Sequence, residues 1–395
     1  MREQGELSAS GGGGPDDTWD AVVIGAGPAG SVCAHALARI GKRVLLVEKA
    51  VMPRAKVCGC CIAPGGAAAL EEAGLGGVLD GAARIDECEV RASGRSMSLP
   101  ARGFRVLGRD VLDSRLAAAA QAAGATLLTG RGASVDADGT VRVRTSGERA
   151  GTAGRARMIV AADGVGGGSL SERPEFAWRV STRSRMGLGA TLVRSPVPLV
   201  PGRMAMLCGR DGYLGLVRLP TGEIDAAAAL DPGAVRNAGG PAGLCARIVT
   251  AAGGDPSALV GAAWRGTPML TRRRARVEAG NIFVVGDAAG YVEPFTGEGM
   301  TWAIHGSLVL ARIIGARLEG RSVPGAWARA HQREIASHHR RCGIVARLVR
   351  NEGLLRAAVA LGTFVPRAMD WAVGVLGQAS AARPACPTMR DRRPA

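Results

Sequence analysis

The sequence predicts an α/β fold with a discontinuous Rossmann-like domain, a second domain built on an antiparallel sheet, and a helical C-terminus. Three observations support this prediction. A buried strand, a glycine-rich turn and a helix follow one another over residues 20–40, which is how a βαβ unit opens. Residues 171–277 hold short apolar runs broken by Gly and Pro, as antiparallel sheets do. The α/β pattern then returns over residues 281–318.

The predicted elements divide the chain into interleaved segments. Strands are predicted over residues 20–24, 43–47, 125–129, 141–144, 157–161 and 281–285, and helices over residues 31–40, 109–123 and 299–318. The predicted boundaries are 1–17 for a disordered leader, 18–80, 104–170 and 278–320 for the Rossmann-like domain, 81–103 and 171–277 for the second domain, and 321–395 for C-terminal helices and a tail.

Length and composition describe a globular protein with room for more than one structural unit. The chain has 395 residues, 47% of them hydrophobic, which excludes a disordered chain and a small disulfide-stapled scaffold. Lys and Arg outnumber Asp and Glu by 50 to 34, giving a formal charge of +16. The arginines are scattered and only 3% of residues are aromatic. We therefore expect no nucleic-acid partner.

The cysteines and the apolar runs set expectations about the cellular compartment. The chain has nine cysteines, an odd number, and residues 1–17 lack the apolar core of a signal peptide. We therefore expect free thiols in a cytoplasmic protein. No uncharged apolar run reaches the roughly 18 residues of a membrane-spanning helix. The apolar, arginine-bearing helices of residues 321–395 are expected to cap a substrate pocket, with peripheral membrane contact as the alternative.

The turn after the first strand carries the glycine pattern of a dinucleotide site. Gly25, Gly27 and Gly30 stand between a buried strand and a helix. Gly25 permits the tight turn, Gly27 lets a pyrophosphate approach the backbone, and Gly30 lets the helix pack closely on the strand. Glu48 ends the next strand, at about the 20-residue spacing of a ribose-binding acid. An acid at this position favours FAD or NAD over NADP.

A second glycine-bearing stretch decides between FAD and NAD. Gly286-Asp287-Ala-Ala-Gly290 is followed by Gly297-Glu298-Gly299-Met300 at the start of a long predicted helix. A simple NAD dehydrogenase does not need this second stretch. With it, residues 19–318 resemble the FAD-dependent oxidoreductases of the aromatic-hydroxylase (p-hydroxybenzoate hydroxylase-like) superfamily, and in particular its geranylgeranyl-reductase-like group.

The resemblance implies roles for individual residues. Asp287 is implied to bond the ribityl chain of FAD, and the backbone of residues 297–300 to face the N1/O2 edge of the flavin. Asp163 matches the middle motif of the superfamily, with a turn cap as the alternative. Arg109 matches an arginine that reaches FAD, with an exposed helix start as the alternative. The residues expected to bind FAD are Gly25, Gly27, Ala29, Gly30, Glu48, Lys49, Arg109, Asp163, Gly286, Asp287, Pro294, Gly297, Gly299 and Met300.

A cysteine-rich loop follows the ribose-binding acid. Residues 53–59 match a loop of the resembled family, which implies that Cys58 and Gly59 pass close to the flavin, with Cys60 and Cys61 as packing residues. A redox dithiol of Cys58 and Cys61, which have C-x-x-C spacing, remains an alternative. No second cysteine or histidine pair at ligand spacing accompanies the loop, so we expect no metal. The three cysteines are weak candidates for a catalytic role.

Three further features are weighed against ordinary structural roles. Tyr213 stands where the resembled reductases carry an aromatic-rich strand motif on the substrate face, although the expected tryptophan is absent, and it is a further weak catalytic candidate. His338 and His339 lie among arginines, with His331 earlier in the segment, which indicates a solvated helix face. The run Arg272-Arg273-Arg274 ends a strand and is expected to be exposed, with an anion anchor as the alternative.

The resemblance implies an enzyme rather than a binding protein. NAD(P)H is expected to reduce the FAD from a transient site, and the flavin then acts on a hydrophobic small molecule by reducing a C=C bond. A flavin monooxygenase that hydroxylates or epoxidises a secondary metabolite is the alternative within the enzyme class. The alternative from another class is a non-catalytic basic protein associated with a membrane surface or with nucleic acid.

Overall fold

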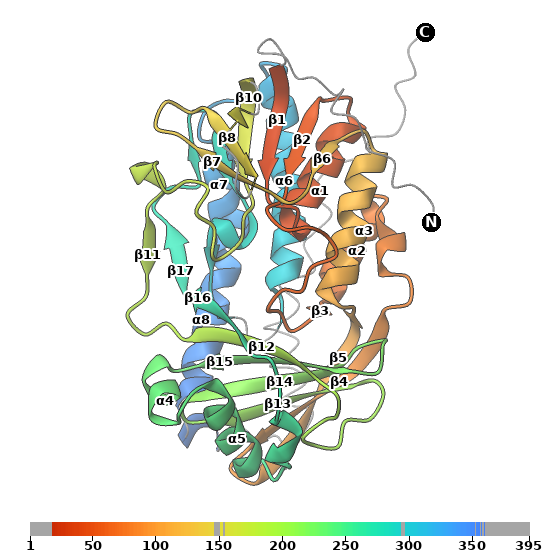
Figure 1. Ribbon diagram of the computed structural model, residues 1–395, viewed down its shortest axis with the longest axis vertical. Helices are drawn as coiled ribbons and strands as arrows, with labels where there is room; N and C mark the ends of the chain where they lie inside the picture. The colour runs from red at the N-terminus through yellow and green to blue at the C-terminus, as the bar shows by residue number, and fades with distance from the viewer. Residues whose placement is uncertain are drawn as a thin grey trace.

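A computed structural model describes residues 18–145, 151–152, 155–293, 297–351, 353–355, 357 and 359. The first domain is built on a six-stranded sheet in the order β18-β19-β10-β1-β2-β6, drawn in the upper part of Figure 1. Its strands are β18 (Glu278–Ala279), β19 (Ile282–Val284), β10 (Arg155–Ala161), β1 (Thr18–Ile24), β2 (Val44–Val47) and β6 (Thr126–Leu128). Every pairing is parallel except that of β18 with β19.

Alternation along the central strands explains the layers on either side of this sheet. Ala21 and Val23 of β1 pack against the helical layer, whereas Val22 and Ile24 pack against a small three-stranded sheet. Both faces are apolar, as a buried parallel sheet requires. The helical layer is α1 (Pro28–Arg39), α3 (Arg109–Ala122) and α6 (Gly299–Leu318), and the small sheet is β7 (Arg131–Val135), β8 (Val141–Thr145) and β9 (Gly151–Thr152).

The second domain is built on an eight-stranded sheet in the order β16-β12-β15-β14-β13-β4-β5-β3. The strands are β16 (Arg265–Met269), β12 (Met186–Leu192), β15 (Ile224–Leu230), β14 (Gly212–Arg218), β13 (Arg203–Gly209), β4 (Ala83–Ala92), β5 (Arg95–Val106) and β3 (Cys61–Ile62). The sheet is mixed rather than purely antiparallel, because β13 pairs in parallel with β4. This pair joins segments far apart in the sequence, so no hairpin signal reveals it.

Helices absent from our sequence prediction cover one face of this second sheet. They are α4 (Pro232–Asn237) and α5 (Pro241–Ala251), and α5 buries Leu244 and Ile248 against the sheet. A further helix, α2 (Pro64–Glu72), packs against α6. The opposite face of the sheet looks towards the first domain (Figure 1). The fold class predicted from the sequence is confirmed.

The C-terminal helices join the two domains along one side of the molecule. They are α7 (Ala326–Glu334) and α8 (Ala336–Arg350), and Figure 1 shows α8 running towards the second domain. Leu355 and Val359 pack in one cluster with Tyr213 of β14. The predicted leader of residues 1–17 and most of the predicted tail lie outside the described residues. Among the described helices, none combines the length and the apolarity that crossing a bilayer requires.

The histidines of α7 and α8 are packed, so the predicted solvated helix face is wrong. The rings of His331 and Trp327 lie 5.4 Å apart, and those of His339 and Trp302 lie 5.0 Å apart. Burial lowers the pKa of both His331 and His339 to about 4. Trp327 lies four residues before His331 in α7, a spacing that the sequence already shows, whereas Trp302 belongs to α6 and is brought to His339 only by the fold.

We expect these two histidines to weaken the fold in mild acid. Their unfolded pKa is about 6.5, whereas the folded value is lower, so the unfolded state takes up protons first as the pH falls from about 6.5 to 4. The double substitution His331→Gln and His339→Gln should therefore reduce the loss of unfolding free energy between pH 7 and pH 5, measured in urea. His305→Gln, which alters the partly exposed histidine beside Glu334, is the matched control. Equal pH slopes in wild type and double variant would contradict the assignment.

Candidate functional site

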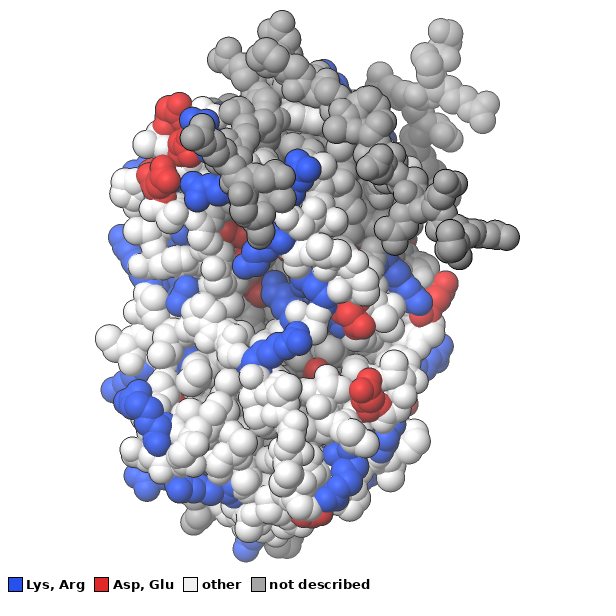
Figure 2. Space-filling model, viewed as in Figure 1, with Lys and Arg blue, Asp and Glu red and all other residues white. Residues whose placement is uncertain are grey.

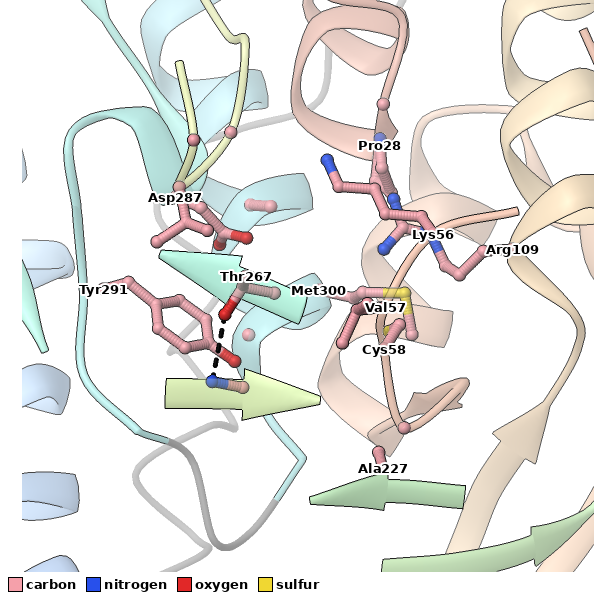
Figure 3. A pocket seen from close by; sticks show the side chains of 18 of the residues that line it. Pro28, Lys56, Val57, Cys58, Arg109, Ala227, Thr267, Asp287, Tyr291 and Met300 are labelled. Atoms are coloured by element: carbon pink, nitrogen blue, oxygen red, sulfur yellow. Dashed lines mark hydrogen bonds between the residues drawn. The ribbon is translucent and has the colours of Figure 1, made fainter. Parts of the chain in front are cut away.

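A cavity of about 710 Å³ lies between the two domains, and both glycine-bearing stretches line it. Gly27 comes from the first stretch, and Asp287 and Gly297 come from the second. The two stretches also touch each other, since a Cβ added at Gly286 would lie 2.7 Å from the Cβ of Ala29. Figure 3 shows the cavity with Asp287 and Tyr291 on one side and Lys56, Cys58 and Arg109 on the other.

Most of the residues predicted to form the site line this cavity. Of the predicted set, the structure places at the cavity wall Gly25, Gly27, Ala29, Glu48, Lys49, Cys58, Cys61, Arg109, Asp163, Tyr213, Asp287, Gly297, Gly299 and Met300. Three further predicted residues do not line the cavity but pack directly behind the residues that do: Gly30, Cys60 and Gly286. Pro294 lies outside the described residues.

The three glycines of the β1–α1 turn have different geometries. Gly25 has φ +103°, and a Cβ there would lie 2.5 Å from the carbonyl oxygen of Ala162. A Cβ at Gly30 would lie 1.8 Å from the carbonyl oxygen of Gly25, so the helix could not pack so close to the strand. Gly27 is different: its nearest neighbours would be Arg109 and Arg54 at 3.8 and 3.9 Å, across the open cavity. Only Gly27 leaves space for a ligand.

Glu48 directly follows β2, and its carboxylate holds the backbone of the β1–α1 turn in place. Its carboxylate accepts hydrogen bonds from the backbone N–H groups of Ala26 and Ala50, both at 3.0 Å, and pairs with Arg54 at 3.2 Å. Burial raises the pKa of Glu48, but the charge of Arg54 and the two backbone bonds outweigh it and lower the pKa overall. The carboxylate therefore stays ionised at the cavity wall, where an acceptor for ribose hydroxyls was predicted.

A buried ion-pair network fixes Arg109 at the cavity wall. Both oxygens of Asp113 accept hydrogen bonds from Arg109, each at 2.9 Å, and Arg54 reaches Asp113 at 3.0 Å. Arg109 is only 7% exposed, so the alternative of an exposed helix start is wrong. Sequence analysis missed Asp113 as an organising residue, although its i, i+4 spacing from Arg109 was visible in the predicted helix.

In the loop after β10, Asp163 caps a turn and also lines the cavity. Asp163 accepts a hydrogen bond from the N–H of Ser169 at 2.9 Å, which caps the turn, and its other oxygen is buried with no partner among the described residues. Arg274 is buried and donates to the carbonyl oxygens of Gly167 and Ala288, so it ties this loop to the stretch that holds Asp287. The prediction that the whole arginine run is exposed is therefore wrong at Arg274.

Cationic side chains gather at the cavity. Figure 2 shows Lys and Arg side chains around a hollow in the middle of the face it presents. Burial lowers the pKa of Lys56, with the charge of Arg109 adding to the effect, and burial raises the pKa of Asp287 across the cavity. The cations that line the cavity are Lys49, Arg54, Lys56, Arg109 and Arg265. Such a set favours an anionic ligand such as a pyrophosphate.

The cysteine loop forms the border between this cationic region and the second sheet. The N–H of Cys60 donates to the sulfur of Cys58 at 3.4 Å. Hydrogen bonding from Cys60 and the positive charge of Arg109 outweigh burial and lower the pKa of Cys58 to about 5. The thiol paired with Cys58 is thus Cys60 rather than Cys61. All described cysteines are free, and the described residues contain no metal-binding group of three or more His, Cys, Asp or Glu side chains.

The residues of the cavity fit FAD. Gly27 leaves open the path that a pyrophosphate would take, cations surround it, and the N-terminus of α6 at Gly299 meets the same cavity. A buried oxygen of Asp163, which lines the cavity, lacks a partner among the described residues, so a polar group remains to be satisfied there. Together these features provide donors and acceptors for a long, anionic, polar cofactor.

Comparison with known proteins agrees with this fit. Residues 18–340 match a family model described as an FAD binding domain. The chain belongs to this FAD-binding domain family. It is 30% identical over 331 residues to a menaquinone reductase of Mycobacterium tuberculosis, covering 76% of this chain and 78% of the relative. It is 31% identical to digeranylgeranylglycerophospholipid reductase 2 of Methanopyrus kandleri, covering 75% of this chain and 76% of the relative.

A solved structure shows the same fold. A flavoprotein/dehydrogenase from Cytophaga hutchinsonii superposes with a TM-score of 0.78 at 18% identity, covering 91% of this chain and 92% of that one. The family match and the two reductase relatives identify the protein as an FAD-dependent oxidoreductase with FAD as its cofactor, and the resemblance stated from the sequence is confirmed. The alternative of a non-catalytic basic protein is wrong.

Proposed function

We propose that this protein reduces C=C bonds of a hydrophobic, isoprenoid-type molecule, with NAD(P)H as the source of electrons. The names of the two relatives support the proposal, because both are reductases and one name specifies a geranylgeranyl lipid. Bound FAD supplies hydride chemistry. The protein supplies the binding pocket, the orientation of the substrate and the proton.

One observation carries the proposal: the cavity continues from the FAD-binding loops onto the apolar face of the second sheet. Met206, Val217 and Leu270 line this region, and Tyr213 is buried beside them. Burying an apolar chain here is favourable, at about 25 cal/mol per Å² of apolar surface removed from water. Cys58 lies where the two regions meet, so its thiol can face both the cofactor and a substrate.

The test is a reduction assay in the absence of oxygen. The holoenzyme is mixed anaerobically with NADH or NADPH and with a menaquinone that carries an unsaturated polyprenyl chain, or with a geranylgeranyl lipid. We expect the flavin colour to bleach and, once any quinol has been reoxidised to the quinone, mass spectrometry to show a gain of H₂ in the isoprenoid chain of the product. A product that forms only in air and contains an added oxygen atom would overturn this proposal and establish the monooxygenase alternative.

A further inference from the structure

An acidic residue lies on the cavity face of the second sheet, among small and apolar neighbours. Strand β15 reads Ile-Asp-Ala-Ala-Ala-Ala-Leu, and Asp225 is its only charged residue. Alternation places Asp225 on the same face as Ala227 and Ala229, both of which line the cavity. Ile224 and Ala226, which point the other way, lie in the core beneath the sheet. A buried carboxyl group at this position requires an explanation.

The carboxyl group of Asp225 meets the cysteine loop. Cys60 forms side-chain hydrogen bonds with both Asp225 and Cys58, and its backbone N–H also reaches the sulfur of Cys58. Oxygen Oδ2 of Asp225 is buried and has no hydrogen-bond partner within the described part of the chain. Asp225, Cys60 and Cys58 thus form a continuous row that begins behind the cavity wall and ends at the cavity.

We propose that Asp225 is a positioning residue that stores a proton and passes it through Cys60 to Cys58. The proposal rests on the proposed function, because adding hydrogen across a C=C bond consumes a proton as well as a hydride. Cys58 begins as a thiolate. The S–H bond of Cys60 breaks as an S–H bond forms on Cys58, and this new S–H bond then breaks as a C–H bond forms on the substrate. The O–H bond of Asp225 breaks to reprotonate Cys60, and water restores the proton to Asp225.

The electrostatics of the row fit this order. Burial raises the pKa of Asp225 well above its ordinary value, the charge of Cys58 raises it further, and the Cys60 hydrogen bond and Arg109 lower it less. The pKa of Cys61, the other thiol facing Asp225, is raised by burial. The neighbours of Asp225 on the adjoining strands, Thr191 and Val217, are uncharged. The raised pKa of Asp225 and the lowered pKa of Cys58 both favour holding the proton on Asp225 rather than on Cys58.

The first test detects this proton directly in the holoenzyme. At pH 7, infrared difference spectra between wild type and Asp225→Asn should show the carbonyl band of a protonated carboxylic acid that the variant lacks. Asp211→Asn is the matched control, because Asp211 is an exposed carboxyl in the turn between β13 and β14 of the same domain. Loss of a carboxylate band instead of a carboxylic acid band in Asp225→Asn would overturn the proposal.

The second test follows the thiol. The rate at which iodoacetamide alkylates Cys58, read by mass spectrometry, should rise around pH 5 in the wild type. A second inflection at higher pH should mark the ionisation of Asp225, and Asp225→Asn should lack it. Cys60→Ser should move the first inflection towards the ordinary cysteine value of about 8.5. Profiles identical to wild type in both variants would overturn the relay.

The two tests separate this inference from the proposed function. A protein that reduces no alkene but shows the infrared band and both inflections would overturn the function and leave the proton store in place. If the Asp225→Asn variant reduces alkenes at the wild-type rate, and the wild type shows neither the infrared band nor the second inflection, the relay is overturned and the proposed function stands.

Discussion

Replacing Gly27 with valine is expected to give a folded protein that retains no FAD. Gly27 has φ −80° and ψ −176°, an extended conformation that any residue adopts, so the substitution strains no backbone. A Cβ there has no atom closer than 3.8 Å, so the fold accommodates it. The valine methyl groups would instead fill the space in which a pyrophosphate meets the N-terminus of α1.

The expected loss is large because phosphate binding depends on close backbone approach. Each hydrogen bond to a charged group contributes about 1.5–3 kcal/mol, so losing two weakens FAD binding by roughly 100-fold or more. Flavin absorbance of the desalted protein gives the FAD content, and circular dichroism verifies the fold. Gly27→Ala, with one methyl group, should show an intermediate loss.

Gly30→Ala provides the contrast that identifies the cause. Its Cβ would lie 1.8 Å from the carbonyl oxygen of Gly25, so α1 would have to move away from β1. We expect this variant to lose folded protein, whereas Gly27→Val loses only the cofactor. Wild-type FAD content in Gly27→Val would refute the assignment of the pyrophosphate path.

The glycine pattern could be read from the sequence because its causes are local. Gly25, Gly27 and Gly30 lie in one turn, and strand, turn and helix succeed one another without interruption. The long helix α6 begins and ends at the predicted residues, Gly299 and Leu318, because a glycine-rich turn precedes it and Gly320 follows it. Such short-range signals predict both the element and the residues that it places at the cavity wall.

What the sequence did not reveal depends on contacts between distant segments. Asp225 is one residue in an alanine-rich strand until the fold brings the cysteine loop of residues 58–61 against it. Arg274 looks like part of an exposed run, yet two loops of the first domain close over it. In each case a charged residue is buried by partners from another segment, and no spacing rule predicts those partners.

Replacing Asp113 with alanine is expected to destabilise the fold by about 3–5 kcal/mol, because it leaves the buried Arg109 without its counter-ion. Asp113 has no exposed surface, accepts hydrogen bonds from Arg109 and forms an ion pair with Arg54. Asp110→Ala, at an exposed position in the first turn of the same helix, should cost about 0.3–1 kcal/mol. Urea unfolding of both variants measures the difference, and equal costs would show that Asp113 is not the organising residue.

The double substitution Arg109→Met and Asp113→Leu separates stability from function. Removing both charges avoids an unpaired buried ion, so much of the lost stability should return. The pKa of Cys58 should nevertheless rise from about 5, because the positive charge of Arg109 helps to keep that thiol ionised. A double variant that is stable but has its Cys58 alkylation profile shifted to higher pH would show that this ion pair matters more for the ionisation of Cys58 than for the free energy of unfolding. An unchanged profile would assign the ionisation of Cys58 to Cys60 alone.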